Sequence, residues 1–218
     1  MSDRNLRQLR EDVVLYARRM YAEGLVTGTS GNISAREESA NVCLVTPSGV
    51  DYDLMKPEDL VLVDLGGNVV EGKLKPSVDT MNHVAIYRAR PDVGSVVHTH
   101  STYAAAFSVV HRDIPALITE SAGYLGGPVR VMEYLPPAMP ELGERAAVGL
   151  GQARAVLLAN HGVNAVGENI KKAYHAAFSV EESAKVAYLA AILGGAVPVP
   201  DGEVERMHEF IHHRYGQR

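Results

Sequence analysis

Apolar side chains recur at steps of three and four residues from Leu6 to Met20, with charged residues between them. This spacing matches the period of a helix and predicts an amphipathic helix in this segment. Gly24 stands where such a helix would end. The next segment, 28–32, is too rich in glycine and polar turn-forming residues for a helix or a regular strand, so it predicts a loop.

Short apolar runs farther along the chain predict strands. Val42–Thr46 is one such run, and the Pro-Ser-Gly sequence after it predicts a turn. Leu60–Leu65 and Val69–Val70 are separated by Gly-Gly-Asn, which is typical of a β-hairpin. Val93–His100 and Ala155–Leu158 predict buried strands that lead into polar, histidine-containing sequences.

Three further segments predict helices. Pro76 precedes a predicted helix over about 78–90, since proline is favoured at helix starts. Asn169–Leu193 predicts a long helix with small residues along much of its length, and a Gly-Gly pair ends it. Glu203–Arg214 predicts a short, charged final helix.

Strands linked both by hairpins and by helices indicate an α/β layered domain with a mixed sheet. A doubly wound dinucleotide fold is disfavoured, because no G-x-G-x-x-G follows the first strand and the glycine-rich segment at 28–31 follows a helix instead. No internal repeat or long linker divides the chain, so residues 1–218 are expected to form a single domain.

Composition narrows the possible partners and the compartment. Acidic residues number 26 and basic residues 21, which gives a net charge of −5 without any basic run, so nucleic acid is an unexpected partner. The single cysteine, Cys43, excludes a disulfide framework and a cysteine-rich zinc module. No stretch is apolar enough to span a membrane, and no apolar secretory core follows Met1. These features predict a cytoplasmic protein.

Histidines supply the sharpest chemical signal. His98 and His100 are two residues apart at the end of a predicted strand, so their side chains point to the same face. Two imidazoles so placed could bind one zinc ion, or they could be ordinary strand-end histidines bonded to backbone or water. His161 lies between Asn and Gly just past another buried strand, in a tight turn that projects its ring forward. Three histidines with one open position form a catalytic zinc arrangement.

Asp79 and three short polar segments are further candidates. A carboxylate at a helix start is favoured by the helix dipole, but beside a metal it could also ligate the ion or carry a proton. The loops around Thr29 and Ser48 offer hydroxyl groups and backbone N–H groups that could bind a phosphate, as could Ser77 ahead of a helix. Either of the two loops taken alone is more typical of a surface turn than of a phosphate site, and Tyr215 taken alone is typical of a free tail.

Taken together, these motifs resemble the class II aldolase/adducin family over essentially the whole chain. The motifs that carry the resemblance occur in this order: Gly28-Thr29-Ser30-Gly31-Asn32-Ile33-Ser34, Thr46-Pro47-Ser48-Gly49, Pro76-Ser77-Val78-Asp79-Thr80, Val97-His98-Thr99-His100-Ser101, Ala159-Asn160-His161-Gly162 and Tyr215-Gly216. The resemblance implies a three-layer α/β/α fold with a mixed, largely antiparallel sheet. It also implies a C4 homotetramer with active sites between subunits.

The resemblance assigns roles to the candidate residues. His98, His100 and His161 would bind a divalent metal, usually zinc, although manganese, cobalt and iron accept the same ligands. Asp79 and Tyr215 would be catalytic, with Tyr215 reaching into a neighbouring subunit's site. The phosphate-binding positions are Thr29, Asn32, Ser48, Gly49 and Ser77.

Two branches of the family are closest, the L-fuculose-1-phosphate aldolases and the L-ribulose-5-phosphate 4-epimerases. The expected activity is zinc-dependent cleavage of a ketose 1-phosphate, such as L-fuculose 1-phosphate, to dihydroxyacetone phosphate and an aldehyde through a metal-bound enediolate. The alternatives are a sugar-phosphate epimerase and a metal-dependent 3-oxo-acid decarboxylase. A non-catalytic module like the adducin head would be expected to lack the three metal histidines.

This chain departs from the family pattern at three positions. Val78 replaces a serine of the phosphate turn. The aldolase tyrosine after Ile-Pro-Ala matches Thr119, followed by Glu120, and the epimerase aspartate matches Gly123, followed by Tyr124. The aspartate at position 79 is itself typical of the epimerases, whereas the aldolases have a glutamate there.

Overall fold

A single mixed sheet organises the protein. The computed structural model describes residues 3–37, 41–137 and 139–216. Among these residues, eight strands pair in the order β4-β3-β2-β1-β5-β8-β7-β6, and β6–β7 is the one parallel pair. The strands are β1 (Asn32–Glu37), β2 (Val42–Val45), β3 (Val61–Asp64), β4 (Val69–Glu71), β5 (Ser95–Thr99), β6 (Val131–Met132), β7 (Ala155–Leu158) and β8 (Gly162–Gly167).

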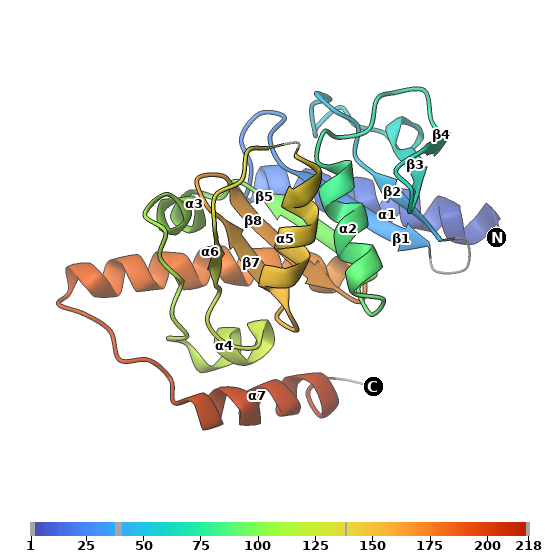
Figure 1. Cartoon of the computed structure of the whole chain (residues 1–218). Coiled ribbons are helices and arrows are strands. Elements are labelled where there is room, and N and C mark those ends of the chain that lie inside the picture. The colour runs from blue at the N-terminus through green and yellow to red at the C-terminus, as the bar shows by residue number, and fades with distance from the viewer. Residues whose placement is uncertain (1–2, 38–40, 138, 217–218) are drawn as a thin grey trace.

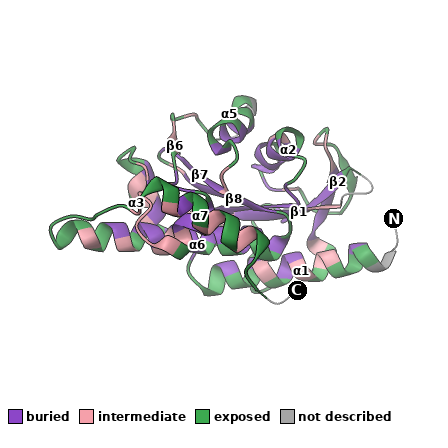
Figure 2. Ribbon diagram, turned by 90° about the horizontal axis from the view of Figure 1, so that it is seen from below, coloured by how far each residue is buried: buried purple, intermediate pink, exposed green. Residues whose placement is uncertain are grey.

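Helices cover both faces of the sheet (Figures 1 and 2). Helices α2 and α5 lie on one face and α1 and α6 on the other, while α7 packs outside them against α4. This arrangement confirms the expected three-layer α/β/α fold with a mixed, largely antiparallel sheet. The helices are α1 (Asp3–Ala22), α2 (Thr80–Ala89), α3 (Thr102–Val109), α4 (Thr119–Leu125), α5 (Pro140–Leu150), α6 (Ile170–Ile192), α7 (Asp201–His213) and the 3-10 turn Pro57–Asp59.

Strand alternation divides the core into two clusters, one on each face of the sheet. Val97 of β5 packs in the cluster beneath α1 and α6, whereas Val96 packs in the cluster beneath α2 and α5. Both valines are fully buried, and burial of such a side chain contributes about 1.5–3 kcal/mol. His98 has the parity of Val96, so its ring faces α2.

Long helix α6 is built to pack closely on the sheet. The Asn169 side chain caps its start by accepting a hydrogen bond from the backbone N–H of Lys172 at 3.0 Å. Its buried face carries small residues, including Ala173, Ala176 and Ala177, which are fully buried against β5 and β8. Small side chains allow the helix backbone to approach the strands that carry the histidines.

The predicted loop over 28–32 needs one correction. Asn32 is the first residue of β1 and pairs with His98 of β5, so the loop ends at Gly31. A Cβ at Gly31 would lie 2.7 Å from the His98 carbonyl oxygen and would also clash with Val26, so only glycine allows this close approach. Within the described ranges, no helix is both long and apolar enough to cross a membrane.

Candidate metal centre

Three histidine rings converge at one end of the central strands. His98 and His100 lie at the end of β5, and their Nε2 atoms are 2.9 Å apart. His161 comes from the turn between β7 and β8, and one ring nitrogen from each of the three residues lies within 4.8 Å of the others. Nitrogens that bind one zinc at about 2.0–2.1 Å lie roughly 3–4 Å from one another. The spacing of the three rings therefore suits a single ion.

A strained turn presents His161. Asn160 has a left-handed φ of 55°, and its side-chain oxygen accepts a hydrogen bond from His111 Nε2 at 2.6 Å. Next along the chain, Gly162 lies against β5, where a Cβ would clash with the Thr99 carbonyl and lie 2.9 Å from His100 Cδ2. The turn thus needs a glycine directly after His161 to bring its ring beside His100.

The protonation states of the rings favour metal binding. His98 Nδ1 lies 3.0 Å from two acceptors, the Val163 carbonyl and the Asn164 side-chain oxygen, so it carries the proton and leaves the Nε2 lone pair free. Burial lowers the pKa of His98 to about 3 and also lowers the pKa values of His100 and His161. Neutral imidazoles are the form that binds a metal, so these residues fit a divalent cation.

Asp79 lies beside the histidines at the start of α2. Its Oδ2 is 4.0 Å from His98 Nε2 and accepts a hydrogen bond from the Asn32 side-chain amide at 2.8 Å. Burial works to raise the pKa of Asp79, but the rings of His98 and His83 and the Asn32 amide bring that pKa below its usual range. Asp79 is therefore an ionised carboxylate next to the metal ligands, although its side chain caps no backbone N–H of the helix.

Thr46 joins the three polar loops into one surface. Its backbone N–H donates to the Ile33 carbonyl at 3.1 Å, and its hydroxyl accepts from the Ile33 N–H at 3.2 Å. Its carbonyl accepts from the Ser77 N–H at 3.1 Å, and the Ser48 N–H donates to the Lys75 carbonyl at 2.9 Å. The segments around 28–32, 46–49 and 75–79 consequently lie next to one another.

The five candidate phosphate positions differ in their exposure. Thr29, Ser48 and Gly49 are exposed, and Gly49 has a left-handed φ of 70°. Ser77 is buried, and its hydroxyl accepts a hydrogen bond from the Asp79 N–H at 3.3 Å. Asn32 is buried and is already bonded to the carboxylate. Three of the five positions are thus open to an incoming group.

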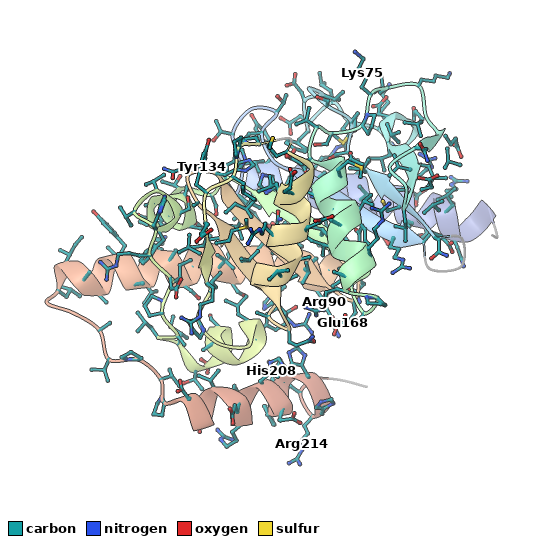
Figure 3. All side chains as sticks on the ribbon, in the orientation of Figure 1. Lys75, Arg90, Tyr134, Glu168, His208 and Arg214 are labelled. Atoms are coloured by element: carbon teal, nitrogen blue, oxygen red, sulfur yellow. The ribbon has the colours of Figure 1, made fainter. Side chains whose placement is uncertain are left out.

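Tyr215 is not brought to the metal centre of its own chain. It lies just past α7, is 71% exposed and packs against Phe210. Figure 3 shows its neighbour Arg214 at the opposite end of the molecule from Lys75, which belongs to the loops beside the metal centre. Tyr215 also lines a cavity of about 690 Å³ between α4, α6 and α7, together with Glu120 and Tyr124.

Packing explains the glycine at position 123. Helix α7 lies directly on α4, and a Cβ on Gly123 would come within 2.5 Å of Met207 Cγ. The Gly123 carbonyl also accepts a hydrogen bond from His208 Nδ1 at 2.8 Å. The next residue, Tyr124, donates its hydroxyl proton to the Lys172 carbonyl. An aspartate at position 123 would therefore have no room while α7 is docked.

Sequence reasoning missed several buried polar residues around the site. Asn82 and Asn164 form an amide pair beside His98, and the buried ring of His83 is hydrogen-bonded through Nδ1 to the Ser34 hydroxyl at 2.7 Å. Asn164 interrupts the apolar sequence of β8, and a polar residue in a strand that is buried throughout was the available signal. The two helix residues give no such signal, because polar residues are common on amphipathic helices.

A family comparison agrees with this geometry. Residues 11–188 match the family described as Class II Aldolase and Adducin N-terminal domain. The chain belongs to this family. The resemblance drawn from the sequence motifs is thereby confirmed. The matched residues include all three of the converging histidines.

Curated relatives of this class II aldolase family member span nearly its full length. One is the 5-deoxy-D-ribulose 1-phosphate aldolase of Bacillus thuringiensis serovar kurstaki, 36% identical over 98% of this chain and 99% of the relative. Another is an L-ribulose-5-phosphate 4-epimerase of Salmonella paratyphi B, 35% identical over 89% of this chain and 92% of the relative. Both an aldolase and an epimerase are therefore similar to this chain at almost equal identity.

Solved structures of the family share the fold closely. An L-fuculose 1-phosphate aldolase superposes with a TM-score of 0.91 at 35% identity, covering 94% of this chain and 96% of that structure. The L-fuculose-1-phosphate aldolase of Thermus thermophilus gives a TM-score of 0.76 at 32% identity, covering 88% of this chain and 98% of that structure.

Proposed function

We propose that this protein is a divalent-metal-dependent aldolase that cleaves a ketose 1-phosphate to dihydroxyacetone phosphate and an aldehyde. The observation that carries the proposal is the convergence of His98, His100 and His161 with the ionised carboxylate of Asp79 beside them. Three imidazoles with an open position suit zinc first, and manganese, cobalt and iron accept the same donors. The aldolase relative that spans 98% of the chain supports the reaction class.

The ion would be held by His98, His100 and His161. When bound, a divalent cation supplies Lewis-acid polarisation of the substrate carbonyl and compensates the negative charge left after the carbon–carbon bond breaks. The protein contributes ligand orientation: the Val163 carbonyl and the Asn164 side chain hold His98 in the tautomer whose Nε2 faces the site.

Asp79 would move a proton at C3, one of the two carbons between which the substrate is cleaved. When the bond between C3 and C4 breaks, its electron pair stays with the three-carbon fragment, and C3 must then gain a proton. In the condensing direction the Asp79 carboxylate removes a proton from C3. In cleavage Asp79 first takes up a proton from solvent and, as the carboxyl group, delivers it to C3. The Asn32 amide holds the same oxygen in place at 2.8 Å.

The three joined loops would bind the substrate phosphate. Thr29, Ser48 and Gly49 offer exposed hydroxyl and backbone N–H groups. Ser77 and Asn32 are buried, and they would join the set only by turning from their present partners around Asp79. Hydroxyls and backbone N–H groups bind phosphate without requiring lysine or arginine. Val78 supplies no hydroxyl and is 69% exposed, so this set is one group smaller than the family pattern.

Tyr215 would act in a neighbouring subunit of a C4 homotetramer. Its exposed position just past α7 supports a role in another subunit's site. Apolar side chains exposed at and beyond the end of α6, including Leu193 and Val197, supply surface for subunit contacts. There Tyr215 would protonate the aldehyde oxygen in condensation and take up the proton that the C4 hydroxyl loses in cleavage.

An epimerase of the ribulose-5-phosphate type is the second candidate. The relative from Salmonella paratyphi B and the aspartate at position 79 favour it. The absence of room for a side chain at Gly123 counts against it, since the epimerases carry their auxiliary aspartate at the matching position. Decarboxylation of a 3-oxo acid is a third candidate reaction for the same metal site. Val78 favours it, because the valine removes a phosphate-binding hydroxyl and a 3-oxo acid carries no phosphate.

Product analysis separates these reactions. The metal-loaded protein would be incubated with L-fuculose 1-phosphate, 5-deoxy-D-ribulose 1-phosphate, L-ribulose 5-phosphate and a 3-oxo acid, and products would be followed by 13C NMR. The proposal expects two fragments, dihydroxyacetone phosphate and an aldehyde, from at least one ketose 1-phosphate. A rearranged pentulose phosphate without fragments would establish the epimerase instead, and release of carbon dioxide would establish the decarboxylase.

A further inference from the structure

A buried pair of asparagines links helix α2 to the metal ligand His98. Asn164 of β8 is fully buried and Asn82 of α2 is 4% exposed. The Asn164 Nδ2 donates to Asn82 Oδ1 at 3.0 Å, and the return bond from Asn82 Nδ2 to Asn164 Oδ1 is longer, at 3.5 Å. Asn164 Oδ1 also accepts from His98 Nδ1 at 3.0 Å. Neither asparagine is a ligand of the candidate ion.

Strand register places this pair in a continuous polar row. Asn32 of β1 pairs with His98 of β5, which in turn pairs with Asn164 of β8, so the three side chains lie abreast on the α2 face. Two residues at the start of helix α2 accept hydrogen bonds from this row. Asp79 accepts one from Asn32, and Asn82, one turn later, accepts one from Asn164. His98 is thus flanked on both sides by bonds to the first turn of the same helix.

Two groups face His98 Nδ1 at the same distance of 3.0 Å, the Val163 carbonyl and the Asn164 side-chain oxygen. The carbonyl can only accept and favours a proton on Nδ1, whereas the Asn164 amide can present either its oxygen or its NH2 group. Asn164 presents its oxygen to Nδ1 because its NH2 group is turned toward α2, where it donates to Asn82 Oδ1. If Asn164 turned over, its NH2 group would face Nδ1 and favour a proton on Nε2 instead.

We propose that Asn82 and Asn164 are positioning residues that set the tautomer of His98 and thereby keep its Nε2 lone pair available to the ion. Asn82 fixes which way the Asn164 amide faces, and Asn164 together with Val163 keeps the proton on Nδ1. The inference rests on the proposed metal site. Because the pair is buried, an amide turned the wrong way leaves polar groups unpaired, so the network has one favoured arrangement.

The first test compares Asn82→Leu with Asn82→Asp in the metal-free, full-length protein. The 15N shifts of the His98 ring, measured near neutral pH, report which nitrogen carries the proton. Asn82→Leu removes the acceptor for the Asn164 amide, and a rise in the Nε2–H tautomer is expected. Asn82→Asp restores an acceptor at the same place, and it should return His98 to the Nδ1–H form.

Metal affinity provides a second readout, measured for zinc by competition with a chromophoric chelator. Removing a direct partner of a metal-bound histidine weakens affinity by about 10–100-fold. Asn82 acts through Asn164, so a loss at the lower end of that range, about 10-fold, is expected for Asn82→Leu. Ser95→Ala is the matched control, because Ser95 is a buried residue of the same strand whose hydroxyl bonds the Ser34 carbonyl rather than His98. Its zinc affinity should equal that of the wild type.

An unchanged tautomer and zinc affinity in Asn82→Leu would overturn the proposal. If that variant does not fold, Asn82→Ala gives the answer: it removes the same acceptor without adding volume, so the Nε2–H form of His98 should again increase. An unchanged tautomer in Asn82→Ala would equally overturn the proposal. The tautomer is measured without metal or substrate, so failure of the aldolase proposal would leave this result readable.

Discussion

His98 illustrates how much one residue position must satisfy at once. It sits on the buried α2 face of the sheet, pairs in register with two asparagines and points Nε2 toward two other imidazoles. Its spacing from His100 was visible in the sequence, because residues i and i+2 of a strand share a face. The hydrogen-bond partners of its Nδ1, Val163 and Asn164, were not, because β8 contributes them from 65 and 66 residues away in the sequence.

Asp79→Asn tests the role of the carboxylate. The amide keeps the size of the side chain but cannot exchange a proton, so kcat should fall by about 10²–10⁴-fold with metal content unchanged. Steady-state kinetics and metal analysis on the same preparation would check both. Retention of full kcat would remove Asp79 from the proton transfer, and loss of the metal would instead make it a ligand.

Gly162→Ala tests whether the turn after His161 depends on close backbone contact. A Cβ there would clash with the Thr99 carbonyl and press on His100, so about 1–3 kcal/mol of stability and most of the metal affinity should be lost. Gly202→Ala is the control, because a Cβ at that exposed position of α7 meets nothing within 4 Å. Equal metal affinity in the two variants would show that the contact does not position the ligands.

At the scale of elements, the strength of the sequence pattern decided what could be predicted. Helices α1 and α6 are long and periodic, and their predicted segments agree with the observed ones to within a few residues. Strand β8 and helix α3 gave no usable pattern. The first is a short strand with a glycine at each end and a buried asparagine inside, and the second is a short, alanine-rich helix without a polar face.

Glu168, just past β8, gives a pH-dependent prediction. The Arg154 side chain, which extends from the start of the neighbouring strand β7, donates to it at 2.7 and 2.8 Å and lowers its pKa from 4.5 to about 2. Because the folded pKa is depressed, the stabilisation is present above pH 4.5 and is lost as the pH falls toward about 2. Glu168 is 43% exposed, so solvent screening limits the contribution to about 1 kcal/mol.

Glu168→Gln should therefore lower the free energy of unfolding near neutral pH by about 1 kcal/mol. Denaturant unfolding at a series of pH values should show this difference shrinking between pH 4.5 and about 2. Glu203→Gln, which removes a more exposed pair with Arg206, should show a smaller difference. If the difference in unfolding free energy between the wild type and Glu168→Gln stays constant down to the lowest pH, the ion pair is not the cause of that difference.

At the scale of the whole molecule, the layered fold was predictable and the assembly was only implied. Mixed hairpin-linked and helix-linked strands indicated the sheet, and the family motifs indicated its layers. The place of α7 on α4 was not predictable, because Gly123 offers no apolar signal and its contact with Met207 lies 84 positions away in sequence. This docking nevertheless decides where Tyr215 lies.

Subunit complementation tests the intersubunit role of Tyr215. His98→Ala and Tyr215→Phe should each be nearly inactive alone. When equal amounts are unfolded and refolded together, random assembly into rings should restore about a quarter of the sites, in which one subunit supplies the histidines and its neighbour the tyrosine. No recovery, with mixed oligomers confirmed by native mass spectrometry, would contradict the shared site.

The most direct test of the central claim is metal-dependent product release. Wild-type protein would be stripped with a chelator, reloaded with one equivalent of zinc and assayed with 5-deoxy-D-ribulose 1-phosphate for dihydroxyacetone phosphate in a coupled reaction. Stripping should abolish release and zinc should restore it, whereas His161→Ala should bind little zinc and stay inactive in both states. Full release from the stripped protein, or from His161→Ala, would contradict the account.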